Sequence, residues 1–149
     1  VEKDGLYNVT VTIDAANDTK TLTYEFTQAV EVAAKDYSAC VLELVGDAVA
    51  EQEGAEKDPS SWGWGNVYSL GTPTANGDVY TWTASNVKLT AGGGFKVRTE
   101  SAQAQGDIPA FDFGVDGNNA TVEKDGLYNV TVTIDAANEA KTLEVTPVE

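Results

Sequence analysis

The sequence predicts an all-β protein that folds as an immunoglobulin-like antiparallel β-sandwich. Apolar and polar residues alternate with period two along most of the chain, and Thr, Val, Tyr and Ile dominate these segments. Gly, Asn, Asp and Pro separate the segments at the spacing that is typical of short sandwich strands. Together these two observations indicate two packed sheets and no helical layer.

An internal repeat sets the predicted domain organisation. Residues 1–22 recur almost unchanged as residues 122–143, at an offset of 121 residues, which is close to the length of one ordinary domain. We expect one complete sandwich domain at 37–149, and we expect 1–36 to be the terminal hairpin of a preceding repeat plus a linker. Repetition of whole domains is typical of surface and adhesive proteins, because it multiplies weak binding without any new contact.

The alternation predicts the individual strands in chain order. A first hairpin is expected at 7–13 and 22–26, and its copy near the end of the chain has Tyr128, Val130, Val132 and Ile134 on one face, a polar turn at 135–139, and a returning strand with Leu143 and Val145. Between the two hairpins, strands are predicted at 28–34, 40–45, 66–70, 79–84, 87–89, 95–99 and 110–113. The stretches 46–65 and 100–109 are predicted to be long loops, which in compact domains are usually functional or mobile.

The composition limits the possible partners. The 149 residues include 24 acidic and 9 basic side chains, for a net charge of −15, so nucleic acid and anionic lipid are unfavourable partners. There is no apolar run long enough for a membrane span, and we expect no direct membrane insertion. A neutral polysaccharide or oligosaccharide is unaffected by this charge.

Catalysis is not expected either. The chain has no histidine, which excludes triads with an imidazole base and zinc sites with histidine ligands. No pair of acidic residues is singled out for glycoside hydrolysis. We therefore expect a protein that is not an enzyme and that needs no cofactor.

Two tryptophans define the first candidate site. Trp62 and Trp64 are separated by Gly63 in a loop that is otherwise polar, and exposed indoles stack on the apolar C–H faces of pyranose rings. The alternative is that one or both indoles fold back onto the core. Trp82 alternates with Tyr80 in a predicted strand, and we expect it to pack in the core.

The predicted strand at 95–99 supplies a second candidate. Alternation turns Phe95 and Val97 inward and Lys96 and Arg98 outward, where the two cations could donate hydrogen bonds to sugar hydroxyls. The alternative is that both cations pair with acidic neighbours.

Two further features favour no site. The stretch 112–119 gathers oxygen ligands around two glycines, as a calcium loop does, but it lacks the EF-hand spacing, so we interpret it as a polar turn without metal. Cys40 is the single cysteine, and we expect a buried, unreactive thiol.

Several short motifs follow one another in a characteristic order. They are Leu42-Glu43-Leu44-Val45-Gly46-Asp47-Ala48, the Trp-Gly-Trp loop, Val79-Tyr80-Thr81-Trp82-Thr83, Gly94-Phe95-Lys96-Val97-Arg98, Phe111-Asp112-Phe113-Gly114 and Gly126-Leu127-Tyr128-Asn129-Val130. Their order and spacing resemble the repeated domains of SusE/SusF-type outer-membrane proteins. The resemblance covers about residues 40–146. It implies a bacterial cell-surface protein of tandem immunoglobulin-like domains, facing outward from the outer membrane, that binds starch or other glycans without cleaving them. It maps the glycan-binding roles onto Trp62, Trp64, Lys96 and Arg98, with Tyr68 as an additional candidate.

The duplicated hairpin leaves a second function open. Near-identical hairpins at both ends would let the hairpin of one subunit take the place of the hairpin of another. The alternative function is therefore a structural or adhesive surface repeat, or a fibre subunit, that associates through exchanged terminal strands. The N-terminal hairpin, whose predicted inward face includes Val9, Val11, Ile13 and Leu22, needs a partner to cover it, either this domain's edge or a neighbouring molecule.

Overall fold

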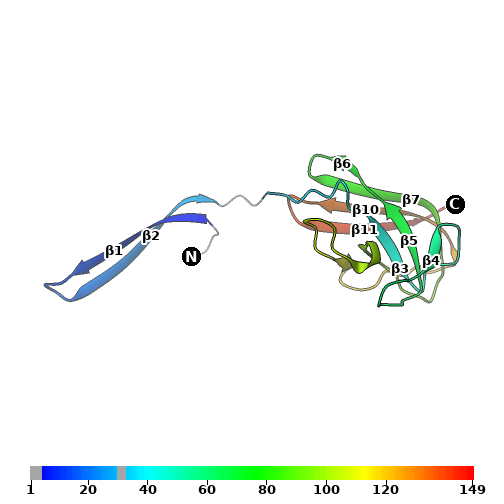
Figure 1. The fold of residues 1–149 in the computed structure, drawn as a ribbon, viewed down its shortest axis with the longest axis horizontal. Coiled ribbons are helices and arrows are strands. Elements are labelled where there is room, and N and C mark those ends of the chain that lie inside the picture. The colour runs from blue at the N-terminus through cyan, green and yellow to red at the C-terminus, as the bar shows by residue number, and fades with distance from the viewer. Residues whose placement is uncertain (1–4, 30–32) are drawn as a thin grey trace. The chain divides into compact units, whose positions relative to one another are not determined.

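The computed structural model of the protein describes residues 5–29 and 33–149. The described residues form two compact units that divide between Ala33 and Ala34. The first unit is a two-stranded antiparallel hairpin of β1 (Gly5–Asp14) and β2 (Thr19–Ala29) (Figure 1). The second unit begins three residues before the predicted start of the domain, because Asp36 already contacts the sandwich and accepts a hydrogen bond from the Tyr80 hydroxyl at 3.3 Å.

The second unit is an antiparallel β-sandwich of two sheets, which confirms the predicted fold class (Figure 1). One sheet has the strand order β11-β10-β7-β6, and the other has the order β4-β5-β3-β8-β9. The strands are β3 (Leu42–Gly46), β4 (Ala55–Lys57), β5 (Asn66–Gly71), β6 (Thr74–Asn76), β7 (Val79–Leu89), β8 (Lys96–Thr99), β9 (Asp112–Phe113), β10 (Gly126–Asp135) and β11 (Ala140–Pro147), with the short 3-10 turn η1 (Glu100–Ala102) after β8. Within residues 5–29 and 33–149, no helix has the length and apolarity that a membrane crossing requires.

The predicted strands at 79–84 and 87–89 are one continuous strand, β7. Asn86 has a φ of 58°, and the register of the neighbouring β10 shifts between Tyr128 and Val130. This irregularity moves the buried positions of β7 from even to odd residue numbers, from Trp82 to Val87. The alternation therefore breaks although the strand does not, and a sequence reading sees two strands.

Other differences concern short or undescribed segments. The edge strands β4 and β6 have three residues each, too few for alternation to be visible. The predicted strand at 28–34 includes residues 30–32, which lie outside the described residues; β2 ends at Ala29, and residues 33 and 34 are not in a strand.

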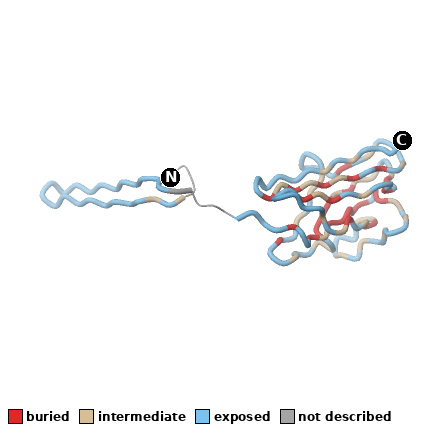
Figure 2. The backbone as a smooth tube through the Cα atoms, turned by 90° about the horizontal axis from the view of Figure 1, so that it is seen from above, coloured by how far each residue is buried: buried red, intermediate tan, exposed pale blue. Residues whose placement is uncertain are grey.

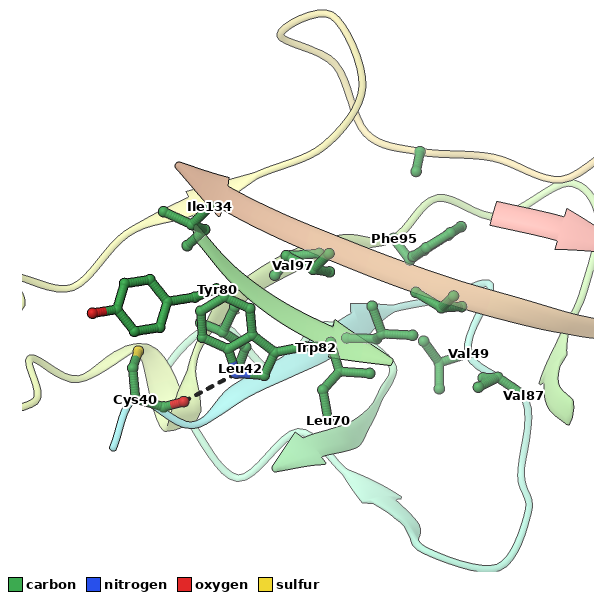
Figure 3. Close-up of a cluster of buried hydrophobic side chains, with 14 of the residues drawn as sticks. Cys40, Leu42, Val49, Leu70, Tyr80, Trp82, Val87, Phe95, Val97 and Ile134 are labelled. Atoms are coloured by element: carbon green, nitrogen blue, oxygen red, sulfur yellow. Dashed lines mark hydrogen bonds between the residues drawn. The ribbon is translucent and has the colours of Figure 1, made fainter. Parts of the chain in front are cut away.

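The core fills the space between the two sheets (Figures 2 and 3). Trp82 lies at its centre, 1% exposed, and its Nε1 donates a 3.0 Å hydrogen bond to the Cys40 carbonyl (Figure 3). Phe95 and Val97 are fully buried, so the predicted inward face of β8 is confirmed. Cys40 is buried as predicted, and burial raises the pKa of its thiol to about 11.

Candidate functional site

The candidate site lies on the outer face of the five-stranded sheet, away from the core. Cross-strand neighbours share a face of a sheet, and the pairing puts Lys96 beside Val45 and Arg98 beside Glu43. Val45 is fully buried even though it does not belong to the cluster between the sheets. The segment 58–65, which carries both candidate tryptophans, covers part of this outer face, because Asp58, Ser60 and Trp62 all contact Arg98.

Arg98 is fully buried, which corrects the expectation that it is exposed and free to bind a sugar. Its side chain does leave the core on the outer face, but the covering loop encloses it. Arg98 Nε donates to Glu43 Oε1 at 2.7 Å, and Nη2 donates to Asp58 Oδ1 at 2.8 Å. Nη1 donates to Ser60 Oγ at 2.9 Å. The alternative of pairing with acidic neighbours is therefore the one observed, and Arg98 holds the loop in place.

Asp58, the partner of Arg98 in this ion pair, also accepts hydrogen bonds from the tryptophan loop itself. Its carboxylate accepts hydrogen bonds from the Ser60 hydroxyl at 2.6 Å and from the backbone N–H groups of Ser60 and Trp64 at 2.9 Å and 3.0 Å. Burial alone would raise the pKa of Asp58, but the hydrogen bonds from Arg98 and Ser60 outweigh it and hold that pKa well below its usual range. The tryptophan loop is thus fixed by a buried, ionised carboxylate.

Trp62 and Trp64, the first candidate site, lie close to Lys96 of the second candidate site. Trp62 is 38% exposed, and its ring lies 4.5 Å from Arg98 Cζ. Lys96 Nζ lies 5.0 Å from the Trp62 ring centre and 5.8 Å from that of Trp64, within the range of cation–π attraction. Trp64 is partly buried, and its Nε1 donates to Asp47 Oδ2 at 3.1 Å. We call Trp62, Trp64 and Lys96 the aromatic platform.

A polar pocket of about 430 Å³ adjoins the platform. Lys96 belongs to both the platform and the pocket lining, and its Nζ donates a 2.8 Å hydrogen bond to Oδ1 of Asp112, which also lines the pocket. A Cβ placed on Gly94 would lie 3.1 Å from Asn119 Cβ and 3.5 Å from Trp64 Cζ2, so the pocket residue Asn119 and the indole flank the same glycine. Ligand sites in proteins are commonly of this size and combine an apolar surface with a few hydrogen-bonding groups.

Tyr68 does not join the platform. It pairs with Leu44, which is fully buried between the sheets, so Tyr68 lies on the inner face of its strand and packs against the core. The resemblance added Tyr68 to the glycan-binding candidates, but its place on the inner face separates it from the platform. The alternation along β5 could have indicated this, because Tyr68 has the same parity as the core residue Leu70.

The stretch 112–119 begins with the two residues of β9 and continues into a tight polar turn at 115–118, which agrees with the interpretation of a polar turn. Val115 and Asn118 exchange two backbone hydrogen bonds of 2.9 Å, and the central Asp116 and Gly117 have φ values of 50° and 78°. Positive φ at both central residues is the type I′ geometry that closes a hairpin. Among the residues that the structure describes, no group of three or more acidic or Cys side chains is arranged to hold a metal ion.

Two parts of the site were missed by sequence reasoning. Asp58 and Glu43, which hold Arg98, were not distinguished among the many acidic residues, although the Asp-x-Ser pattern at 58–60 is a known turn signal. The contribution of Asn119 to a pocket was also missed, because it depends on a contact between distant loops. No family model matches the chain, and no curated protein or solved structure is significantly similar to it.

Proposed function

We propose that this protein is a non-catalytic carbohydrate-binding module. The observation that carries the proposal is the aromatic platform beside the polar pocket, with Lys96 common to both. Indole faces stack on the C–H surfaces of sugar rings, while ammonium, amide and carboxylate groups bind hydroxyls. A neutral polysaccharide is the ligand class that this combination fits best.

The roles of the individual residues follow from their exposure. Trp62, the most exposed of the three tryptophans, provides the stacking surface, and Trp64 extends it toward the pocket. Lys96 donates to sugar hydroxyls. The Asn119 amide is exposed and makes no side-chain hydrogen bond to another residue of the described chain, so it supplies a donor and an acceptor. Arg98 serves as a positioning residue for Trp62.

Binding without cleavage is part of this proposal. A glycosidase needs one carboxylic acid that stays protonated near neutral pH. Asp58, the carboxylate that holds the tryptophan loop, has its pKa lowered and is enclosed by its partners, so it does not supply such an acid. From the SusE/SusF-type resemblance, we further propose that the module belongs to a multi-domain protein on the bacterial cell surface, at the outer membrane, where several weak sites act together.

The test is a titration of intrinsic tryptophan fluorescence with soluble glucans, fructans and host-type glycans. We expect a saturable change with at least one of them. Trp62→Ala and Asn119→Ala should each weaken binding about tenfold, equivalent to about 1.4 kcal/mol. Tyr68→Phe is the matched control, because Tyr68 lies on the opposite face of the sheet, and its affinity should equal that of the unchanged protein.

Two outcomes would refute the proposal. One is the absence of any saturable change across the panel in protein whose thermal unfolding shows an intact fold. The other is binding that survives Trp62→Ala and Asn119→Ala but is lost on Tyr68→Phe, which would place the site elsewhere.

A further inference from the structure

The two hairpins of the chain are the same structural element. The pairs Val9–Tyr24, Val11–Leu22 and Asp14–Thr19 of β1–β2 correspond to Val130–Val145, Val132–Leu143 and Asp135–Ala140 of β10–β11, always at the offset of the sequence repeat. The turns agree as well. Asn17 Nδ2 donates to Asp14 at 2.8 Å, and Asn138 Nδ2 donates to Asp135 at 2.7 Å. Strand register and turn geometry are therefore properties of the repeated sequence itself.

The two hairpins differ in what covers their apolar face. On β10, Val130, Val132 and Ile134 are at most 1% exposed, because β10 pairs with β7 and packs on the core. The equivalent residues of β1 are Val9, Val11 and Ile13, and they are 63% to 66% exposed. The whole hairpin is accordingly coloured as exposed along most of its length (Figure 2). The sandwich thus shows directly which surface fits the face that β1–β2 leaves open.

The second strand extends the same apolar face. Leu22 and Tyr24 are 64% and 56% exposed, whereas their counterparts Leu143 and Val145 pack against the core. A two-stranded hairpin is marginally stable alone, and a contiguous exposed apolar patch marks an interaction surface. The face of β1–β2 is therefore built to be covered.

We propose that β1–β2 is a second closing hairpin whose partner is another copy of this chain, in which β7 and the core accept it in the place of β10–β11. The described residues contain two such hairpins and one sandwich that accepts such a hairpin beside β7. The strand that pairs with β7 has the same sequence in both hairpins, so these contacts are equal, although Tyr24 stands in the second strand where Val145 packs against the core. The covalent connection of β10–β11 to its own sandwich then favours the chain's own hairpin over that of another copy. The accepting place is in the four-stranded sheet, and the aromatic platform is on the other sheet. The proposal is therefore independent of glycan binding.

This connection also predicts how often exchange occurs. The covalent connection between β10–β11 and the rest of its own sandwich acts as a short tether, which gives this hairpin an effective concentration in the millimolar range at its place beside β7. At a protein concentration of about 10 μM, the hairpin of another copy should then occupy on the order of 1% of the places. This fraction should rise with protein concentration, and it should rise sharply when β10–β11 no longer fits.

The experiment uses the full chain and engineered disulfide cross-links. Thr133 of β10 pairs with Thr81 of β7, and Thr12 is the equivalent of Thr133 in β1. The substitutions Thr12→Cys and Thr81→Cys therefore bring two thiols together only if β1 lies against β7. Cys40 does not interfere, since it is buried and its pKa is raised. The pair Thr133→Cys and Thr81→Cys is the matched control, which should form a disulfide within each chain.

Adding Val132→Asp gives the stronger test. Val132 is fully buried, and a carboxylate there disfavours the chain's own β10. We expect cross-linked dimers and larger species to form from most of this variant, against a small, concentration-dependent fraction without Val132→Asp. A further Val11→Asp change should abolish these species, because it spoils the donor hairpin in the same way.

Three results would overturn the proposal. The first is that the control pair cross-links but the Thr12→Cys pair does not, with or without Val132→Asp. The second is that the cross-linked chain has the mass of a monomer, which would mean that β1–β2 fits its own sandwich and not a second copy. The third is that Val11→Asp leaves the cross-linked species unchanged. If Val132→Asp does not fold, the Thr12→Cys and Thr81→Cys pair without this change still tests the proposal, because its sandwich is intact.

Discussion

The buried cation under the aromatic platform gives the sharpest prediction. The substitution Arg98→Met keeps an unbranched apolar stem but removes the guanidinium group and its charge. Arg98 donates four hydrogen bonds of 2.7–3.3 Å to Glu43, Asp58 and Ser60. Without it, two enclosed carboxylates lie on one sheet face with no cation between them.

The magnitude follows from the burial of the partners. Removing one member of a buried ion pair costs about 3–5 kcal/mol, because the remaining charge stays desolvated. The side chains of Arg98 and Asp58 are 0% exposed and that of Glu43 is 7% exposed, so this range applies. The loss is a large fraction of the roughly 5–15 kcal/mol by which a domain is stable. It corresponds to a decrease in Tm of roughly 10–15 °C for a chain of this size.

Lys96→Met is the matched control for stability. It removes the same charge two residues away on the same strand face, but the Lys96–Asp112 pair is 25% and 40% exposed, so it should cost no more than about 1 kcal/mol. Urea unfolding monitored by intrinsic tryptophan fluorescence measures the free energy of unfolding of both variants. If Arg98→Met costs no more than Lys96→Met, the buried network does not hold the loop, and the reasoning is refuted.

Three further predictions concern the same framework. Since the pKa of Asp58 is lowered in the folded state, its contribution to stability should be complete above the ordinary carboxylate pKa of about 4 and be lost as the pH falls further; Asp58→Asn should remove this acid-labile part in unfolding measured from pH 6 to pH 2. Cys40, with its pKa raised to about 11 by burial, should react with a thiol reagent at pH 8 only after denaturant is added, and fast reaction of the native protein would contradict the core packing. Trp82→Phe should cost about 2–4 kcal/mol, because it leaves a cavity and an unpaired Cys40 carbonyl, and a change below 1 kcal/mol in urea unfolding would contradict the central place of this indole.

How far the sequence could lead depends on the range of the interactions involved. Alternation is local, so it predicted the inward face of β8, the core position of Trp82 and both hairpins. It failed at β7, where a bulge shifts the alternation without ending the strand. It also could not show β4 and β6, which are strands only because a neighbouring strand pairs with them.

The candidate site shows the same difference between what local sequence patterns predict and what contacts between distant segments decide. The sequence identified Trp62, Trp64 and Lys96 by residue type, and the structure brings them together. It predicted the outward direction of Arg98 but not the burial, because alternation describes the two faces of a strand and says nothing of a loop that folds over one of them. Tyr68 was a candidate only through the family resemblance, and the pairing of β5 with β3 puts it on the inner face of the sheet, opposite the platform.

The sequence by itself determined the all-β class, the strand pattern and the duplication of one hairpin, because these depend on side-chain periodicity and on identity between segments. The tertiary structure alone decided which carboxylates meet Arg98, how Asn119 comes to lie beside Trp64, and that Val11 is open to solvent while Val132 is buried. The physical reason is that contacts between distant segments depend on how the two sheets and their loops pack. Nearly identical sequences such as those of the two hairpins therefore acquire different environments from their place in the fold.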